Sequence, residues 1–395
     1  MTWRPTRRAF AVAAAGVLLL LAASTAQAGW LFVLSAGVFG LVAASLVTRH
    51  RLGRARLTRT APERTRVGDE VRVGLTLTNP SRSALPLMRI EDHHEAFDPL
   101  VVVSERLAGR SSAEIETVRM ARRRGAFSGG KAVIVSGAPF GMARSIRSVG
   151  VSTEVTVVPR WVELTSFPIR EPSSTPSEVL HERARTGAGA EYLGVREYRP
   201  GDPMRWIHWR SSARAGHLIV REYEEEVASP VDIVLGGADT GTPPDSSFEA
   251  AVAAAASIAV YAISTGHPVR LHRSSIHGAH SLVEPGRVGA LDWLAGAAPL
   301  DAPLDPVVSA AVSGTTRRGT LVIVTTTGGT AGESLRGAVR GAQSAGARVI
   351  VVAAVAETWD PAHPSTEHVL QQIGAGRAWM RTLSQGKELG LCLQG

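Results

Sequence analysis

The sequence comprises 395 residues, of which 44% are apolar. This length suffices for about two or three domains, and the apolar content excludes a chain that is disordered throughout. The formal net charge is +8, but the arginines are scattered and several flank an apolar segment, so we expect no nucleic-acid partner. The single cysteine, Cys392, excludes a disulfide within the chain.

The N-terminal part contains two uncharged apolar segments, at about residues 9–28 and 30–48. Each has roughly the 20 residues that a helix needs to cross the hydrocarbon core of a membrane. Arginines flank the pair on both outer sides: Arg4, Arg7 and Arg8 precede it, and Arg49, Arg51, Arg54, Arg56 and Arg59 follow it. Because basic flanks stay in the cytoplasm, residues 1–56 predict a transmembrane helical hairpin in the plasma membrane. The lipid bilayer is then a partner, and the soluble body is cytoplasmic.

A secretory signal is the alternative interpretation of the same N-terminus. A basic start and an apolar segment are followed by Ala26-Gln27-Ala28, which has the small residues of a cleavage site. Residues 6–10 also resemble a twin-arginine export signal. Because a second apolar segment follows at once, the protein remains membrane-bound in either case.

The body is predicted to contain two domains joined by a connector. Alternating apolar and polar residues, as in residues 70–78, predict antiparallel strands and a small β-sandwich-like domain over residues 57–160. Prolines among polar residues, such as Pro172 and Pro176, indicate an exposed connector within residues 161–228. Residues 229–395 alternate apolar strands with helical segments, which predicts a doubly wound α/β domain. The fold class is therefore multidomain.

Several elements of the α/β domain are predicted in detail. Ser246 or Ser247 is expected to cap a long alanine-rich helix, which ends before Gly266. The predicted strands are residues 231–235, 268–272, 321–325 and 348–355, and further predicted helices are residues 288–297 and 333–344. Continuous apolar strands of this kind indicate a mostly parallel sheet.

The connector contains a block, residues 194–226, that is unusually rich in Arg, Trp and His. Asp202 and Pro203 are typical of a helix start, so we predict a helix that runs to about Ala213, with Gly216 beyond its end. The arginines are expected to pair with carboxylates of the block as a structural clasp, and a recognition surface is the alternative. The residues of this clasp are Arg196, Arg205, Arg210 and Arg214 with Asp202, Glu222, Glu224 and Glu225.

The same block resembles the signature of a bacterial family, the domain of unknown function 58 family. The matching residues are Arg196, Tyr198, Gly201, Asp202, Arg205, Ile207, His208, Trp209, Ser212, Ala213, Arg214, Leu218 and Glu222. The resemblance extends to the two N-terminal apolar segments, to a β-rich segment ending in residues 139–141, and to a von Willebrand factor A-like C-terminal domain. Ala138 departs from it, since the family pattern has Asp there. The resemblance implies work with a MoxR-type AAA+ ATPase, and often with transglutaminase-like membrane proteins, in assembly at the membrane.

Many von Willebrand factor A domains bind Mg²⁺ through an Asp-x-Ser-x-Ser loop and ligands from later loops. Here Asp239 stands in the corresponding loop without the serines, and no acidic residue follows Thr326 and Thr327. These three residues are the best candidate ligands, but they are too few to complete the coordination of the ion, so we predict no metal site. No phosphate-binding loop is evident, and we expect no cofactor.

The remaining titratable residues are predicted to be ordinary surface groups. His93 and His94 are expected in a solvated loop, and His272 is expected at the surface. Arg119 is assigned to a basic patch with Arg122, Arg123 and Arg124, which either contacts anionic lipid or is simply solvated.

These features predict a membrane-anchored, non-enzymatic adaptor or assembly factor. Two alternatives stay open. One is a metal-dependent ligand-binding or adhesion-type receptor, and the other is an enzyme centred on Asp202, His208 and Arg214.

Overall fold

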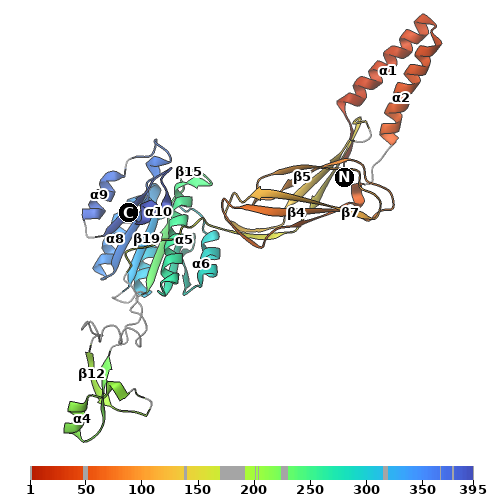
Figure 1. Ribbon diagram of the computed structural model, residues 1–395. Helices are drawn as coiled ribbons and strands as arrows, with labels where there is room; N and C mark the ends of the chain where they lie inside the picture. Colours follow the sequence, from red (N-terminus) through yellow and green to blue (C-terminus); the bar gives the residue numbers. More distant parts are fainter. Residues whose placement is uncertain are drawn as a thin grey trace. The chain divides into compact units, whose positions relative to one another are not determined.

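The computed structural model describes most of the chain (Figure 1). The described residues are 2–47, 52–137, 140–169, 192–200, 202, 204–223, 230–314, 319–364, 366–375 and 378–394. Residue contacts divide the chain into two units, Met1–Arg160 with Leu291–Ala297, and Trp161–Ala290 with Ala298–Gly395. Features predicted from sequence that lie outside the described residues are Arg49, Arg51, Ala138, Pro172, Pro176, Gly201, Pro203, Glu224 and Glu225.

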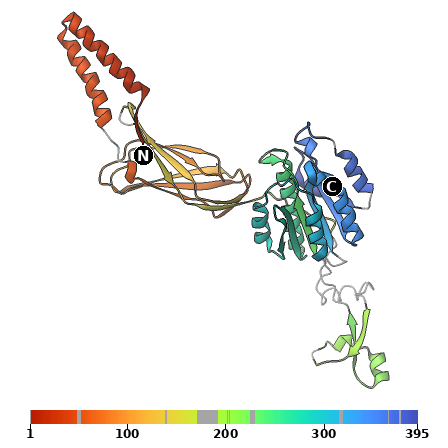
Figure 2. The same ribbon diagram turned by 180° about the vertical axis from the view of Figure 1, so that it is seen from behind.

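Two apolar helices, α1 (Arg7–Ala26) and α2 (Gly29–Val47), lie side by side (Figures 1 and 2). Gly16 permits their close approach, since a Cβ atom there would lie 3.1 Å from Val38 Cγ1. The hydroxyl of Ser35 donates a hydrogen bond to the Gly16 carbonyl oxygen across the contact (3.0 Å). In a helix pair that stands in lipid, such small residues and interhelical hydrogen bonds replace the hydrophobic drive to associate.

Among the described helices, α1 and α5 (Ser247–Ser264) are long and apolar enough to cross a membrane. The two helices differ in burial, since 17% of the 18-residue apolar stretch of α1 is buried, against 67% of that of α5. Helix α5 is therefore a core helix of the α/β domain, whereas α1 leaves most of its apolar surface uncovered.

A short strand that the sequence did not reveal precedes α1. This strand, β1 (Thr2–Pro5), pairs antiparallel with β10 (Ala143–Gly150). Thr6 continues the contact, because its backbone N–H donates to the Met142 carbonyl oxygen (2.8 Å). The start of α1 is thus hydrogen-bonded to a strand that lies far along the chain.

The segment that follows α2 is tied to the same strand. Arg147 of β10 donates from its guanidinium to the carbonyl oxygen of Leu52 (2.6 Å) and to that of Ala55. Leu52 and Ala55 are themselves fully buried in the core of the β-domain. Both ends of the helix pair are therefore held by one sheet.

The β-domain consists of three sheets, with strand orders β1-β10-β9-β5-β6, β2-β4-β7 and β3-β11-β8. The further strands are β2 (Arg56–Thr60), β3 (Arg64–Arg66), β4 (Glu70–Asn79), β5 (Met88–His93), β6 (Leu100–Ser104), β7 (Ser111–Met120), β8 (Gly125–Ser128), β9 (Lys131–Ser136) and β11 (Glu154–Val158). One apolar cluster joins Leu57 of β2 and Leu75 of β4 to Ile90 of β5 and Ile134 of β9. The first two sheets therefore share a core, and the alternation predicted for residues 70–78 is the burial pattern of β4.

A buried carboxylate, Asp92 of β5, lies between two buried guanidinium groups. Arg59 of β2 donates to it through Nε (3.1 Å) and through a second, shorter contact. Arg119 of β7 donates to Asp92 Oδ2 (2.6 Å) and to the Asp98 carbonyl oxygen. The three side chains are almost fully buried, and burial lowers the pKa of Arg119. The ion cluster joins strands of two sheets.

One prediction about these arginines is therefore wrong, since Arg119 does not belong to an exposed basic patch. Arg59, which follows the second apolar segment, is buried in β2. Both occupy inward positions of their strands, and Asp92 compensates the charge that burial would otherwise make unfavourable.

The α/β domain has a six-stranded sheet of order β18-β17-β14-β19-β20-β21, and all pairings in it are parallel except β17–β18. Its strands are β14 (Val231–Gly236), β17 (Val269–Ser275), β18 (Gly278–Val283), β19 (Thr320–Thr326), β20 (Arg348–Ala354) and β21 (Trp379–Leu383). Its other helices are α6 (Arg287–Ala295), α7 (Asp305–Gly314), α8 (Gly329–Ser344), α9 (Glu367–Ala375) and α10 (Leu389–Gln394). The mostly parallel sheet was predicted, whereas β18, α7, α9, β21 and α10 were not.

Helices cover both faces of this sheet (Figures 1 and 2). Helices α7 and α8 share an apolar cluster with one face, and α5 packs against β14, β17, β19 and β20 outside that cluster. Ser246 caps α5 by accepting a hydrogen bond from the Glu249 N–H (3.4 Å), as predicted. A multidomain α/β chain with two apolar N-terminal helices is therefore established.

The substitution Asp92→Asn should destabilise the β-domain by about 3–5 kcal/mol, because it leaves two buried guanidinium groups without a carboxylate. The measurement is hydrogen exchange of the β2 and β5 amides in the full chain in detergent micelles. Glu114→Gln, at an exposed position of β7, is the matched control and should change stability by less than about 0.5 kcal/mol. Equal exchange in the two variants would contradict the role of the ion cluster.

Candidate functional site

The signature block folds into a small module, residues 192–223. Its elements are β12 (Tyr192–Glu197), a 3₁₀ turn (Met204–Trp206), α4 (Trp209–Ala215) and β13 (Ile219–Tyr223). Strands β12 and β13 pair antiparallel, and Ile207 bridges to Val220. Ile207 and Val220 are buried, so the block builds its own small core.

Asp202 is held by β12 and the loop that follows it. Arg196 donates two hydrogen bonds to its carboxylate (2.7 and 2.8 Å), and the Arg199 N–H donates a third (2.8 Å). The bond from Arg196 is the main cause that lowers the pKa of Asp202 to about 2. Asp202 was predicted to cap a helix; instead its carboxylate closes the loop, and the next described element is the 3₁₀ turn Met204–Trp206.

Helix α4 begins later than predicted and is capped by His208. The Nδ1 atom of His208 accepts a hydrogen bond from the Ser211 N–H (3.2 Å). The buried hydroxyl of Ser212 accepts from the Ile219 N–H (2.8 Å) and thereby fixes α4 to β13. Gly216 ends the helix with φ 74°, a left-handed conformation that favours glycine.

The outer surface of the module combines aromatic, apolar and cationic side chains. Trp209 is 63% exposed and Met204 is 68% exposed. Arg205, Arg210 and Arg214 are also exposed, and among the described residues none of the three forms an ion pair. We call these five residues the Arg/Trp surface.

The predicted clasp is therefore present only between Arg196 and Asp202 among the described contacts. The side chain of Glu222 lies outside the described residues, as do Glu224 and Glu225. Arg205 lies in the 3₁₀ turn and outside α4, whereas Arg210 and Arg214 are both on α4.

Three residues of the block were the centre of the enzyme hypothesis. Asp202 is occupied by Arg196, His208 caps α4, and Arg214 is exposed in the last turn of that helix. No hydrogen bond among the described residues joins the three.

Tyr198 makes a backbone contact from its N–H to the Leu218 carbonyl oxygen (2.9 Å), which extends the pairing of the hairpin.

The candidate metal ligands of the α/β domain take part in structural hydrogen bonds. Asp239 Oδ1 accepts from the Phe248 N–H at the start of α5 (3.1 Å). Thr326 Oγ1 donates to the Ala238 carbonyl oxygen (2.8 Å), and Thr327 Oγ1 accepts from a backbone N–H of a later loop (2.9 Å). Within the described residues, no three His, Cys, Asp or Glu side chains come together in a way that could hold a metal ion.

His272 lies in the sheet and not at the surface, so that prediction is wrong. Its Nε2 is 3.0 Å from Asp232 Oδ1, and its Nδ1 is 2.8 Å from the hydroxyl of Ser281. Arg270 donates to the other oxygen of Asp232 (2.7 Å). Asp232 is fully buried and Ser281 is exposed, so a hydrogen-bonded chain runs from the surface to a buried carboxylate across three strands.

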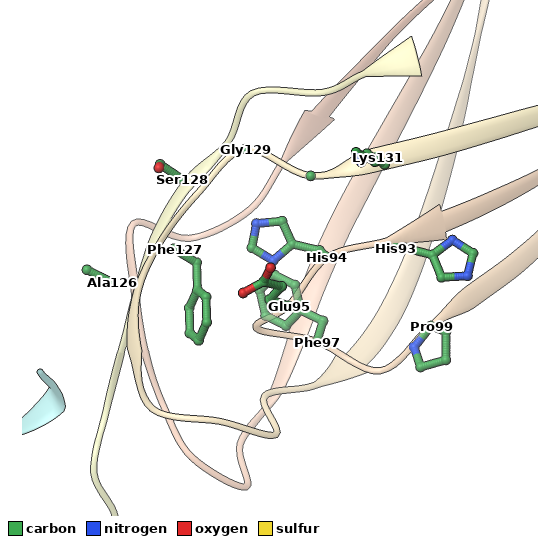
Figure 3. Close-up of a pocket in the computed structure, with 11 residues that line it drawn as sticks. His93, His94, Glu95, Phe97, Pro99, Ala126, Phe127, Ser128, Gly129 and Lys131 are labelled. Atoms are coloured by element: carbon green, nitrogen blue, oxygen red, sulfur yellow. The ribbon is translucent and has the colours of Figure 1, made fainter. Parts of the chain in front are cut away.

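A pocket of about 690 Å³ opens on the β-domain. Figure 3 shows His94 and Phe97 from one segment beside Phe127 from another. His94 is 5% exposed, and burial, followed by the nearby Arg59 cation, lowers its pKa. Its Nδ1 accepts from a backbone N–H (3.2 Å), so the ring is neutral with the proton on Nε2. The prediction of a solvated loop is wrong for His94, while His93 is exposed.

The fold and the signature block define a multidomain α/β protein with an apolar N-terminal helix pair. The model of the family described as Protein of unknown function DUF58 matches residues 194–326. The resemblance is thus confirmed over these residues, which comprise the module and the first half of the α/β domain. Comparison of the sequence with curated proteins gave no match.

Similar solved structures include a CARDB domain from Pyrococcus furiosus in complex with di-metal ions, with 10% identity, a TM-score of 0.20 and coverage of 26% of this chain and 91% of that chain. An alkylpurine DNA glycosylase from Pseudomonas fluorescens has 12% identity, a TM-score of 0.16 and coverage of 26% and 30%. A β-glucosidase from Listeria innocua has 13% identity, a TM-score of 0.13 and coverage of 26% and 16%. At these TM-scores the likeness carries no argument about activity.

Replacing Arg196 with Gln should raise the carboxyl pKa of Asp202 from about 2 toward its ordinary value of 3.8. The folded pKa lies below the ordinary value, so this contact stabilises the module above pH 3.8 and is lost as the pH falls through about 2. The measurement is an NMR titration of the Asp202 carboxyl group. Arg210→Gln is the matched control and should leave the titration unchanged, whereas a wild-type titration near pH 3.8 would show that the contact does not form in solution.

Proposed function

We propose that the chain is a membrane-anchored, non-enzymatic adaptor or assembly factor, and that its module docks a partner protein. The observation that carries the proposal is the Arg/Trp surface, in which Trp209 and three arginines are exposed on a small folded unit. Trp and Arg are the residues that dominate the binding energy of protein interfaces. The polar groups that chemistry would use, Asp202 and His208, have structural partners instead.

The partner we propose is a MoxR-type AAA+ ATPase that works with the chain in a cell-envelope-related process. A transglutaminase-like membrane protein is the second proposed partner. Both follow from the family resemblance, which the match over residues 194–326 supports. A surface with three arginines that form no ion pair among the described residues is complementary to an acidic patch, so the docking site on the ATPase should be acidic with an apolar pocket for Trp209.

We assign the anchor to α1 and α2, which cross the membrane together as a hairpin. Helix α1 has 20 residues and a mean hydropathy of 2.2, and α2 is a further apolar helix packed along it. The pairing of β1 with β10 supports this arrangement. Because β1 belongs to a sheet of the domain that follows α2, a hairpin that returns the chain to the same side of the membrane fits this pairing.

The same pairing supports retention of α1. Cleavage after Ala28 would remove β1 from a sheet in which it has formed a four-residue ladder. We therefore favour the uncleaved hairpin over the secretory signal, with the body in the cytoplasm on the side of the basic flanks. For the C-terminal domain we propose a von Willebrand factor A-like fold that binds its partners without a metal ion, because its candidate ligands are engaged in structural hydrogen bonds.

Reporter fusions should place both chain ends in the cytoplasm. A C-terminal green fluorescent protein fusion should be fluorescent, and a C-terminal alkaline phosphatase fusion should be inactive. An N-terminal epitope tag should remain on the full-length protein in the membrane fraction. Active phosphatase would reverse the orientation, and loss of the tag together with β1 would establish the cleaved form.

Trp209→Ala should weaken binding to a MoxR-type ATPase about 30-fold, which is the loss of about 2 kcal/mol expected for a central Trp. Arg210→Glu should weaken it as well, because it places a negative charge against an acidic patch. The measurement is biolayer interferometry with the full chain in nanodiscs.

Arg106→Glu, at an exposed position of the β-domain, is the matched control and should bind normally. Trp209 is largely exposed, so its truncation should leave folding intact. The proposal fails if wild-type protein does not bind the ATPase, or if it binds and the Trp209 and Arg210 variants bind equally well.

A further inference from the structure

Two arginines lie directly opposite each other where the helix pair meets the β-domain. In the antiparallel ladder between β1 and β10, Arg4 is the partner of Arg144, and both side chains are exposed. Directly opposed side chains in such a ladder have Cβ atoms about 4.5–5.5 Å apart, so like charges there are destabilising. The ladder has only four residue pairs, so its other pairs contribute little stability to offset this repulsion.

A third arginine approaches the same place from α1. Arg8 is exposed in the first turn of the helix, and its guanidinium lies 4.0 Å from the point that a Cβ atom of Gly141 would occupy. The hydroxyl of Thr6 donates to the Gly141 carbonyl oxygen (2.8 Å), so the first turn of α1 is held against the segment that leads into Arg144. Arg4, Arg8 and Arg144 form what we call the arginine cluster.

No acidic side chain compensates the arginine cluster through an ion pair in the part of the chain that the structure describes. The sequence has no Asp or Glu in residues 1–62 or in residues 117–153, which together contain β1, β10 and its other neighbour β9. Among the described contacts, none of the three arginines forms an ion pair. Helix α1 has no acidic residue in its first turn and no side-chain cap, so the positive end of its dipole adds to the same field.

The location of the cluster determines which anion can reach it. The cluster is followed at once by the apolar segment of α1, so insertion of that helix brings the three guanidinium groups to the depth of the lipid headgroups. Anionic lipids concentrate at this depth and attract basic residues that adjoin a membrane helix. Guanidinium groups also bind phosphate with paired, charge-assisted hydrogen bonds.

We propose that Arg4, Arg8 and Arg144 bind the phosphate of an anionic phospholipid headgroup, such as that of phosphatidylglycerol. The inference rests on the proposed insertion of α1 in a membrane. The bound phosphate relieves the repulsion between Arg4 and Arg144 and closes the β1–β10 ladder. Anionic lipid thereby fixes the β-domain to the membrane surface, and its loss frees the N-terminal strand.

The test measures hydrogen exchange of the β1 and β10 amides in the full chain. The protein is placed in nanodiscs of phosphatidylcholine alone, of phosphatidylcholine with phosphatidylglycerol, or of phosphatidylcholine with inorganic phosphate in the buffer. Wild-type amides should exchange about tenfold more slowly with phosphatidylglycerol, which corresponds to a lipid concentration about ten times Kd. Inorganic phosphate should not reproduce this protection.

The substitution Arg144→Gln makes the prediction sharper, because it removes both the repulsion and a ligand. Its ladder should be protected more than that of wild type in phosphatidylcholine alone, and phosphatidylglycerol should add no further protection. Arg4→Gln should behave in the same way. Arg106→Gln, an exposed arginine elsewhere on the β-domain, is the matched control and should retain the wild-type response.

Equal wild-type exchange with and without phosphatidylglycerol would overturn the inference, as would equal protection by inorganic phosphate or an unchanged lipid response in Arg144→Gln. Carbonate extraction of membranes separates these results from a failure of the proposed function. If the wild-type protein is extracted, the anchor itself is wrong. If it stays in the membrane but does not respond to anionic lipid, only the arginine cluster is misassigned.

Discussion

The pairing of β1 with β10 constrains the architecture of the first unit more than any other contact. The chain starts in a sheet, leaves it through α1, returns through α2 and enters the same domain again. Arg147 then holds the returning segment by the carbonyl groups of Leu52 and Ala55. The strand before α1 and the segment of Leu52 and Ala55 after α2 are thus both hydrogen-bonded to β10.

The buried charges of the β-domain follow from a different constraint. Burial of Asp92 depends on Arg59, which donates to both of its oxygens, and on Arg119, which donates to Oδ2, and each arginine needs the carboxylate in return. This mutual dependence joins β2, β5 and β7. It also places a positive group beside His94, which after burial is the next cause of the lowered pKa of that ring.

Periodicity predicted some elements of the chain, because apolar residues indicate which face of a strand or helix is buried, but it missed β1, β18, α7, α9, β21 and α10. The alternating burial of strand β4 corresponds to the predicted pattern. Helix α5 starts at the predicted cap, Ser246. The buried polar groups could not be predicted in the same way. Asp232 and His272 are 40 residues apart in sequence, and only the parallel register of β14 and β17 brings them together. One signal was available for Arg59, since it alternates in phase with Leu57, which faces the core.

The signature block shows the limit of local rules most clearly. Asp202 followed by Pro203 has the composition of a helix start, yet Arg196 and the Arg199 N–H take the carboxylate, and His208 caps the helix instead. The competing partner lies on β12, so it could be recognised only once the hairpin was known.

The same competition bears on function. A catalytic constellation requires polar groups that point together into a pocket and remain free to react. In this module the described side chains of Asp202 and His208 have hydrogen-bond partners within the fold, whereas Trp209, Arg210 and Arg214 are exposed. A surface built in this way can recognise another protein, and its exposed aromatic and cationic groups are the ones that interfaces use most.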